Sequence, residues 1–116
     1  MKIGTDIVSI ERIAKSVEKS GDRFLHRFLS ATEIAMAKST SSIAGYWAAK
    51  EAISKALGCG IGRDLAFHDI LLSKDSRGAP HFTLSPKAQE LHAIKSSSLS
   101  ISHDGGFAIA VVVVVL

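Results

Sequence analysis

The sequence predicts an α+β fold in which a small antiparallel sheet packs against one long central helix. Residues 43–57 place apolar side chains at three- and four-residue spacing, which is typical of an amphipathic helix, and Gly58 follows where such a helix ends. Short alternating segments near both ends of the chain are typical of strands. The length of 116 residues suits one hydrophobic core, so we expect a single domain over residues 1–116.

The first strand and the first helix are expected to follow one another directly. Residues 2–9 alternate around apolar side chains and predict a short strand. Ser9 is a good N-cap, so a helix is expected from there through Lys19. Gly21 should end this helix, because glycine readily leaves the helical conformation.

Two more short helices are predicted before the central one. The segment 22–29 carries apolar residues at helical spacing. Ser30 and Glu33 have the spacing of a capping box, so a further helix should run to about Lys38. A polar break follows, and we expect Ser42 to cap the central helix.

The second half of the chain predicts a hairpin and a short helix. Residues 66–74 and 79–84 are expected to pair as antiparallel strands across a tight turn. Ser85 precedes a proline, a combination typical of a helix start, so a helix is expected over residues 86–95. The polar residues 95–98 then predict a loop.

Two further strands are expected over residues 99–104 and 107–116, joined by a Gly-Gly turn. Val111–Val115 are apolar at consecutive positions, so both faces of the last strand require burial. A single sheet in a small domain has only one inner face. The second face must therefore pack on a helix or on another copy of the chain, and we favour a homo-oligomer.

Composition and charge argue against several classes of protein. The net charge of +3 favours acidic partners, but the basic residues are spread out and aromatic residues are few, so we expect no nucleic-acid binding. The longest apolar run, Phe107–Leu116, is about half the length of a membrane helix, and no signal-peptide pattern precedes Asp6. Cys59 is the only cysteine, and no base that would activate it is identifiable. We expect a cytoplasmic protein that binds no membrane.

Asp6 and the central helix form the first candidate site. Glu51 lies between Lys50 and Lys55 on the expected polar side of the helix, together with Ser54. Asp6 is unusual in so apolar a strand. The two carboxylates could converge on one Mg²⁺, and the lysines would attract phosphate. In the alternative interpretation, Asp6 faces water or caps a helix, and Glu51 and Lys55 form a surface pair worth about 0.3–0.5 kcal/mol.

Other patterns are weaker signals. Residues 58–62 are rich in glycine, but they match neither a Walker loop nor a dinucleotide fingerprint, and a helix C-cap explains them equally well. The dipeptides His68-Asp69 and His103-Asp104 are similar to the metal-binding pairs of HD phosphohydrolases, yet those proteins are all-helical. At a strand end, His103 is either a phosphate contact or a hydrogen-bonded turn residue.

Four segments of the chain form a pattern that is more specific than any one of them. They are IGTDIVSIERI (3–13), RFLHRFLSATE (23–33), WAAKEAISKALGCGIG (47–62) and ISHDGGFAIAVVVVV (101–115). In this order and at these spacings they resemble the holo-acyl-carrier-protein synthases, the small bacterial type of 4′-phosphopantetheinyl transferase. The intervening residues 67–82 also fit that family, so the resemblance covers nearly the whole chain.

The resemblance implies an enzyme of fatty acid biosynthesis. Members of that family transfer 4′-phosphopantetheine from coenzyme A to a serine hydroxyl of apo acyl carrier protein and release adenosine 3′,5′-bisphosphate. They require Mg²⁺. They form trimers with active sites at the subunit interfaces, which agrees with the doubly apolar last strand.

The resemblance also implies roles for individual residues. The metal ligands are expected to be Asp6 and Glu51, and the catalytic residues Glu51 and Lys55. Contacts with coenzyme A are expected from Lys50, Ser54, Lys55, Gly58 and His103, and contacts with the acidic carrier protein from Arg12, Arg23 and Arg27. In one departure from the family, Tyr46 stands where an arginine is frequent, so a phosphate contact from that side is in doubt, although its hydroxyl could replace part of it.

Two points stay open from the sequence. Either Glu51 or a water on the metal could take the proton of the serine nucleophile.

Two other functions also fit parts of the pattern. A non-catalytic trimeric module that binds nucleotides or acidic proteins would need the basic face but not Asp6 and Glu51 together, and a metal phosphohydrolase would release phosphate without any carrier protein.

Overall fold

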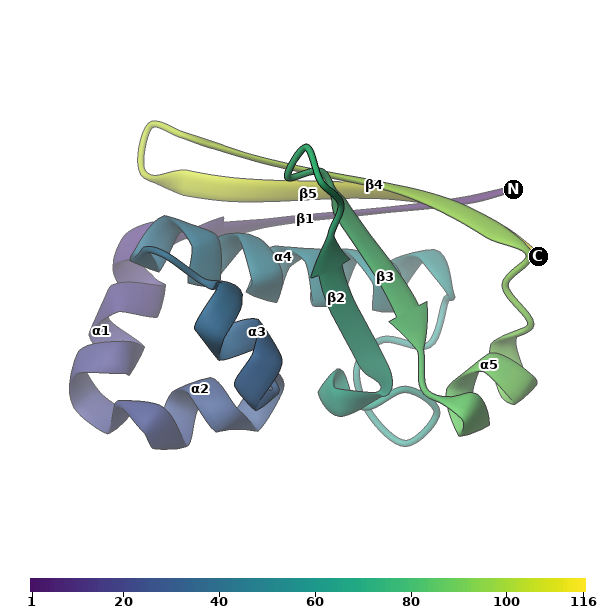
Figure 1. The fold of residues 1–116 in the computed structure, drawn as a ribbon, viewed down its shortest axis with the longest axis horizontal. Coiled ribbons are helices and arrows are strands. Elements are labelled where there is room, and N and C mark those ends of the chain that lie inside the picture. Colours follow the sequence, from purple (N-terminus) through teal and green to yellow (C-terminus); the bar gives the residue numbers. More distant parts are fainter.

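The computed structural model describes every residue from Met1 to Leu116 and has the α+β fold that the sequence predicts (Figure 1). A strand and three short helices precede the long helix, and a hairpin, a short helix and two strands follow it. In chain order the elements are β1 Lys2–Ser9, α1 Ile10–Ser20, α2 Asp22–Phe28, α3 Ala31–Met36, α4 Thr40–Ala56, the 3₁₀ turn η1 Phe67–Asp69, β2 Ile70–Lys74, β3 Pro80–Leu84, α5 Pro86–His92, β4 Ser96–Asp104 and β5 Phe107–Val115.

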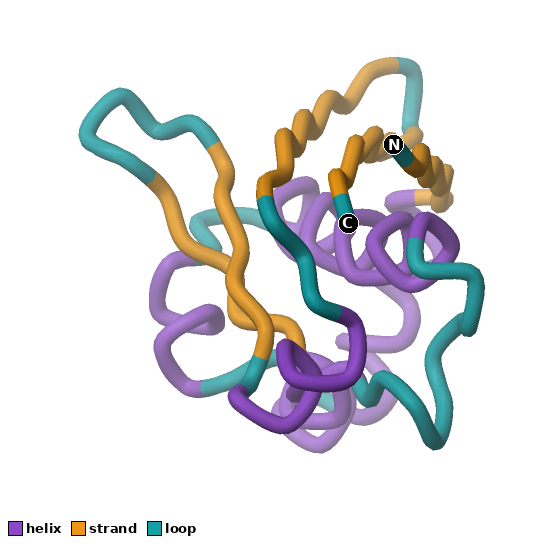
Figure 2. The backbone as a smooth tube through the Cα atoms, turned by 90° about the vertical axis from the view of Figure 1, so that its right-hand side faces the viewer, coloured by secondary structure: helices purple, strands orange, loops and turns teal.

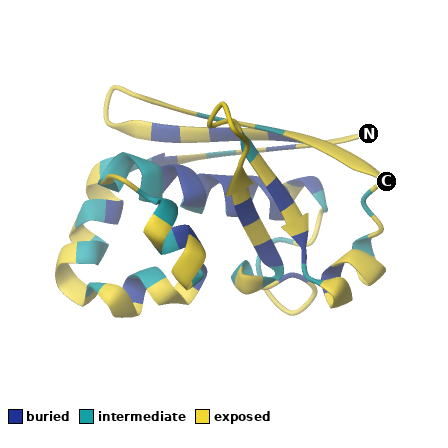
Figure 3. Ribbon diagram, in the orientation of Figure 1, coloured by how far each residue is buried: buried dark blue, intermediate teal, exposed yellow.

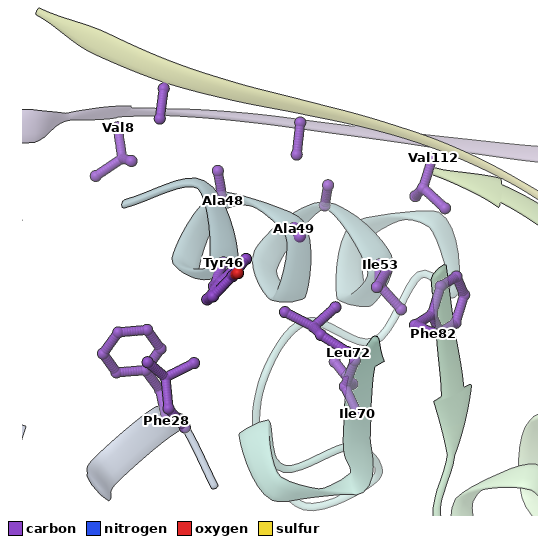
Figure 4. Close-up of a cluster of buried hydrophobic side chains, with 14 of the residues drawn as sticks. Val8, Phe28, Tyr46, Ala48, Ala49, Ile53, Ile70, Leu72, Phe82 and Val112 are labelled. Atoms are coloured by element: carbon purple, nitrogen blue, oxygen red, sulfur yellow. The ribbon is translucent and has the colours of Figure 1, made fainter. Parts of the chain in front are cut away.

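The strands form two separate antiparallel sheets (Figure 2). One sheet has three strands in the order β1-β5-β4, and the other is the β2–β3 hairpin. Helix α4 lies between them. The three-stranded sheet covers one side of α4, and Ile70, Leu72 and Phe82 of the hairpin pack toward its other side (Figure 4). This arrangement places α4 at the centre of the hydrophobic core.

Small residues allow α4 and the three-stranded sheet to approach closely. Ala48 and Ala52 of α4 are fully buried, as are Ala108 and Ala110 on the inner face of β5. Gly4 of β1 lies so close to α4 that an added Cβ would come within 1.9 Å of the Ala52 carbonyl oxygen. Any side chain at this position would therefore push β1 away from the helix.

An aromatic cluster fixes α2 against α4. The rings of Phe24 and Phe28 from α2 lie 6.0 and 5.0 Å from the ring of Trp47 on α4. Phe67 of η1 completes the cluster, 5.1 Å from Trp47. Contacts of this kind orient helices more strictly than aliphatic packing does, because aromatic rings prefer tilted and offset arrangements.

The predicted start signals of α1 and α3 are confirmed. The Ser9 hydroxyl accepts a hydrogen bond from the Arg12 amide, and Ser30 and Glu33 make both bonds of a capping box. The predicted cap of α4 is wrong, because α4 begins earlier than expected. Ser39 is its N-cap, and the hydroxyl of Ser39 accepts a hydrogen bond from the amide of Ser42.

Three predicted boundaries in the second half are also wrong. The first residues of the segment expected as a strand from position 66 form η1, and β2 begins at Ile70. Helix α5 ends at His92, because Ala93 adopts a left-handed conformation with a φ of 54°. Of the residues 95–98 expected as a loop, the three serines from Ser96 onward belong to β4, since strand pairing with β5 reaches back to Ser96.

The outer face of strands β1 and β5 is apolar and exposed, and exposed residues alternate with buried ones along β5 (Figure 3). Val112 and Val114 point to the core and are fully buried, whereas Val111 of the same strand is 38% exposed. Ile3 and Ile7 on β1 are more than half exposed. The chain therefore covers only one of the two faces that the sequence indicates should be buried. No helix has the length and apolar character to cross a membrane.

Candidate functional site

Asp6 and Glu51 converge on one cavity, as the sequence predicts. Asp6 comes from β1 and Glu51 from α4, and both line a cavity of about 260 Å³ that we call the acidic cavity. Arg12 of α1 also lines it, and its apolar wall includes Phe24 and Trp47 of the aromatic cluster. The interpretation of Asp6 as an isolated solvent-facing carboxylate is therefore wrong.

Lys55 forms an ion pair with Asp6. Its Nζ donates a hydrogen bond of 2.9 Å to Asp6 Oδ1, and the two side chains are 54% and 14% exposed. The expected surface pair between Glu51 and Lys55 is not formed, because Lys55 reaches across to β1 instead. One ammonium group and two carboxylates therefore lie together at the edge of α4.

The electrostatics of the acidic cavity suit a divalent cation. Burial raises the pKa of Glu51, the nearby Asp6 carboxylate raises it further, and Lys55 lowers it. Two carboxylates that repel one another in this way gain from a shared cation, and carboxylate oxygens are ligands that Mg²⁺ prefers. No third His, Cys, Asp or Glu joins them within the chain, so further oxygen ligands would have to come from water or substrate.

The prediction that Lys50 lies on the polar side of α4 is wrong. Lys50 is fully buried, and its Nζ donates to Glu33 Oε1 at 2.8 Å, the Phe28 carbonyl at 2.7 Å and the Phe67 carbonyl at 3.2 Å. These three acceptors use all three N–H groups of the ammonium. Burial lowers the pKa of Lys50, and the hydrogen bond and charge of Glu33 oppose this shift.

Glu33 is a buried residue whose second role the sequence did not reveal. Beyond its capping bond with the Ser30 amide, its Oε2 accepts a hydrogen bond from the Leu72 amide in the middle of β2. Together with Lys50 it links α3, α4 and β2. The capping-box spacing identified Glu33 as a local helix signal, and nothing in the sequence indicated its distant partners.

Ser54 is also buried, although the sequence analysis placed it on the polar side of the central helix. Its hydroxyl donates to the Glu51 carbonyl at 2.7 Å. Gly58 follows the end of α4 with a φ of 78°, as predicted for a residue after a helix. The next turn folds back on the helix, because the Gly60 amide donates to the Ser54 carbonyl. The expected contacts of Ser54 and Gly58 with coenzyme A stay predictions.

His103 lies in a different cavity from Asp6 and Glu51. This second cavity has a volume of about 180 Å³, and we call it the basic cavity because Lys74 and His103 line it together with Tyr46. It belongs to the β4 side of the three-stranded sheet, whereas Asp6 lies on β1 at the other edge. Within one chain, His103 and the two candidate metal ligands therefore lie at different cavities.

The three arginines predicted to contact a carrier protein are exposed. Arg12 lies on α1, and Arg23 and Arg27 lie one turn apart on α2. None of them has a carboxylate within 4.0 Å, so their charges are free. Because Arg12 lines the acidic cavity and α2 contributes Phe24 to it, this basic face adjoins that cavity.

The remaining sequence candidates have structural roles. His68 Nε2 lies 2.8 Å from the His26 carbonyl oxygen and joins η1 to α2. Asp69 accepts hydrogen bonds from the Ala66 amide and the Ser85 hydroxyl, which lower its pKa. The pKa of the Cys59 thiol is raised, chiefly by loss of hydration, so the thiol is protonated at neutral pH.

Comparisons with known proteins agree with the resemblance described above. A sequence model of the 4′-phosphopantetheinyl transferase superfamily matches residues 2–112. The chain is 64% identical to a holo-[acyl-carrier-protein] synthase of a Sulfurovum species, over 96% of this chain and 93% of the relative. It is 58% identical to the synthase of Campylobacter curvus, over 97% and 98% of the two chains.

Solved structures show the same likeness in three dimensions. The Helicobacter pylori holo-[acyl-carrier-protein] synthase in complex with coenzyme A superposes with a TM-score of 0.95 and 55% identity, over 97% of this chain and 99% of that one. The synthase of Bacillus anthracis, also in complex with coenzyme A, has a TM-score of 0.82 and 39% identity, over 97% and 94% of the two chains.

Proposed function

Since the chain belongs to the 4′-phosphopantetheinyl transferase superfamily and is a transferase, we propose that its acidic cavity carries out the holo-acyl-carrier-protein synthase reaction. A serine hydroxyl of apo acyl carrier protein attacks the phosphorus that carries the pantetheine arm of coenzyme A. A new bond forms between that phosphorus and the serine oxygen, the pyrophosphate bond breaks, and adenosine 3′,5′-bisphosphate leaves. The observation that carries the proposal is the convergence of Asp6 and Glu51 on one cavity, with Lys55 in an ion pair with Asp6.

Asp6 and Glu51 fit Mg²⁺ and would hold it. Their carboxylates come from different elements, border one cavity and repel each other, which is the donor chemistry of a hard divalent cation. When bound, Mg²⁺ supplies charge neutralisation for the pyrophosphate. We assign the acceptance of the serine proton to the Glu51 carboxylate, because it lines the cavity in which the reaction is proposed to take place.

Lys55 is the cation that stabilises the negative charge of the leaving group. Its ammonium has one partner, Asp6, and its side chain is more than half exposed, so two N–H groups remain for phosphate oxygens. Phosphoryl transfer depends mainly on positioning and charge stabilisation, and a lysine at this point neutralises the charge that develops on the departing phosphate. Lys50, with its three internal acceptors, has no N–H left for this task.

The active enzyme is proposed to be a homotrimer with sites between subunits. The exposed apolar outer face of strands β1 and β5 is the surface that the trimer would cover. A neighbouring copy would also bring a basic cavity, with its His103, to the acidic cavity of the next subunit. Light scattering should give about three times the chain mass of 12.3 kDa. Ile109→Glu on the outer face should give monomers, whereas Leu91→Glu on α5 should not.

The basic face of Arg12, Arg23 and Arg27 is proposed to bind the acidic carrier protein. Reversing one charge with Arg23→Glu or Arg27→Glu should raise the KM for carrier protein about three- to tenfold and leave the KM for coenzyme A unchanged, because complementary charges act mainly on encounter with the partner. Lys87→Glu on α5 is the matched control. Equal effects on both KM values would reject the docking face.

Intact-protein mass spectrometry of apo acyl carrier protein tests the reaction itself. Incubation with the enzyme and coenzyme A should add one phosphopantetheine group, and only when Mg²⁺ is present. No gain from a folded trimer would favour the non-catalytic binding module, and phosphate release without carrier protein would favour a phosphohydrolase. We propose that the enzyme acts in the cytoplasm, in fatty acid biosynthesis.

A further inference from the structure

Lys50 is a charged residue inside the protein to which the proposed reaction assigns no role, and its ammonium group lies at the end of α2. The last carbonyl groups of a helix have no partner within that helix. Phe28 ends α2 and is fully buried, and the Lys50 Nζ donates a hydrogen bond of 2.7 Å to its carbonyl oxygen. Lys50 of α4 therefore caps the C-terminus of α2 from inside the protein.

The same ammonium group holds a second aromatic residue. It donates to the carbonyl oxygen of Phe67 in η1, at 3.2 Å. The rings of Phe28 and Phe67 lie 5.0 and 5.1 Å from the ring of Trp47, which stands about one turn before Lys50 on α4. Each of these two residues is thus held by α4 twice, through its ring and through its backbone. The backbone bond fixes the end of α2 more strictly than the ring contact does, because a hydrogen bond is directional.

Helix α2 belongs to both the basic face and the acidic cavity. It carries two of the three arginines of the basic face, and its Phe24 lines the acidic cavity. Glu51, the residue after Lys50, lines the same cavity from α4. The bond from Lys50 to the Phe28 carbonyl oxygen therefore connects the helix that would bind carrier protein to the turn of α4 that holds a candidate metal ligand.

We propose that Lys50 is a positioning residue for the transfer reaction, because its cap on α2 holds the basic face in the orientation that binds carrier protein. This inference rests on the proposed function. Lys50 itself does not touch substrate, since Glu33 and the two carbonyl oxygens use all three of its N–H groups. A docking helix that is already fixed avoids the cost of being ordered when the partner binds. Loss of the cap should therefore weaken the binding of carrier protein and leave the binding of coenzyme A unchanged.

Steady-state kinetics of the double variant Lys50→Met/Glu33→Gln tests this role, because the variant removes both buried charges and leaves the Phe28 carbonyl without the Lys50 donor. It should raise the KM for carrier protein about three- to tenfold, as expected for a docking surface that must be ordered on binding. The KM for coenzyme A, and the kcat at saturating carrier protein, should each change less than about twofold. Leu84→Ala is the matched control for stability. It truncates a buried side chain of β3 outside both cavities, so it should lower the melting temperature and leave both KM values unchanged.

Hydrogen exchange of the backbone amides tests the cap directly. Relative to the amides of α4, those of α2 should exchange at least about tenfold faster in the double variant than in the wild type, because local opening of α2 no longer breaks a bond to a charged group. In Leu84→Ala this ratio should stay that of the wild type. Faster exchange of α2 with an unchanged KM for carrier protein would overturn the positioning role, and so would unchanged exchange.

Calorimetry with apo acyl carrier protein and with coenzyme A decides the inference even if no transfer is detected. The double variant should bind carrier protein about three- to tenfold more weakly than the wild type does, and coenzyme A with the same affinity. Equal losses for both ligands, or no loss for carrier protein, would overturn the assignment of Lys50. Failure of the wild type to modify carrier protein, with this binding difference intact, would instead count against the proposed reaction alone.

Discussion

Lys50 and Lys55 stand five residues apart on the same helix, and each is paired with one carboxylate, yet their surroundings are opposite. The Lys50–Glu33 pair is closed off from solvent, with side chains 0% and 2% exposed, whereas the Lys55 side chain is 54% exposed. Lys50 also donates to two carbonyl oxygens, and Lys55 makes no other bond. The sequence motif treats the two lysines alike, and their environments separate them.

The difference shows how one helix serves two purposes. The buried pair holds α3, the hairpin and α4 together from inside, so it stabilises the fold that orients Glu51. The exposed pair holds a cation beside the acidic cavity in a position from which it can move to a substrate. A buried ion pair is costly to break and an exposed one is not, so the two pairs should respond very differently to substitution.

The largest effect is expected from Lys50→Met. It leaves Glu33 as an uncompensated buried carboxylate and should lower the free energy of unfolding by about 3–5 kcal/mol, measured by urea denaturation. The double variant Lys50→Met/Glu33→Gln removes both charges and should be more stable than Lys50→Met alone. If the double variant is no more stable, the buried charge is not the cause.

Glu51→Gln should reduce transfer at least about hundredfold, which corresponds to about 2.7 kcal/mol of transition-state stabilisation. The substitution removes a carboxylate from the acidic cavity while keeping its size, so the circular dichroism spectrum should be unchanged. Mass spectrometry of carrier protein measures the rate. Full turnover by this variant would remove Glu51 from the active site.

Lys55→Met should lower kcat about tenfold to hundredfold and change the free energy of unfolding by less than about 1 kcal/mol, because the Lys55 side chain is 54% exposed and is not part of the core. Lys15→Met, which breaks an exposed pair with Glu11, is the control for stability. A loss of several kcal/mol for Lys55→Met would mean that the two lysines have the same structural role, contrary to the comparison above.

The smallest effect concerns the pH dependence of stability. The pKa of Glu51 is raised in the folded state, so between its unfolded and folded values the native protein binds more protons than the unfolded chain. The free energy of unfolding should therefore fall as pH rises through this window, and Glu51→Gln should abolish that fall. Thermal denaturation of both proteins without added metal, at several pH values, measures the difference.

Local signals allowed much of the fold to be predicted. Ser9, Gly21, Ser30 and the alternation of residues 2–9 marked boundaries correctly, because caps and strand periodicity depend on neighbours in the chain. The cap of α4 was misplaced because serines fill several positions before it, and each is a good N-cap. The start of β4 was missed because its serines pair with β5, a partner that local polarity does not reveal.

The sequence by itself determined the family, the elements and the pairing of Asp6 with Glu51 as candidate ligands. Only the tertiary structure decided that Lys50 is buried and that Lys55 forms a hydrogen bond with Asp6. The links that Glu33 makes between three elements also depend on it. So does the position of Tyr46 and Lys74 at one cavity. The reason is physical. Helical and strand spacing fixes which side chains share a face, but burial, pKa and ion pairing depend on what other elements bring to that face.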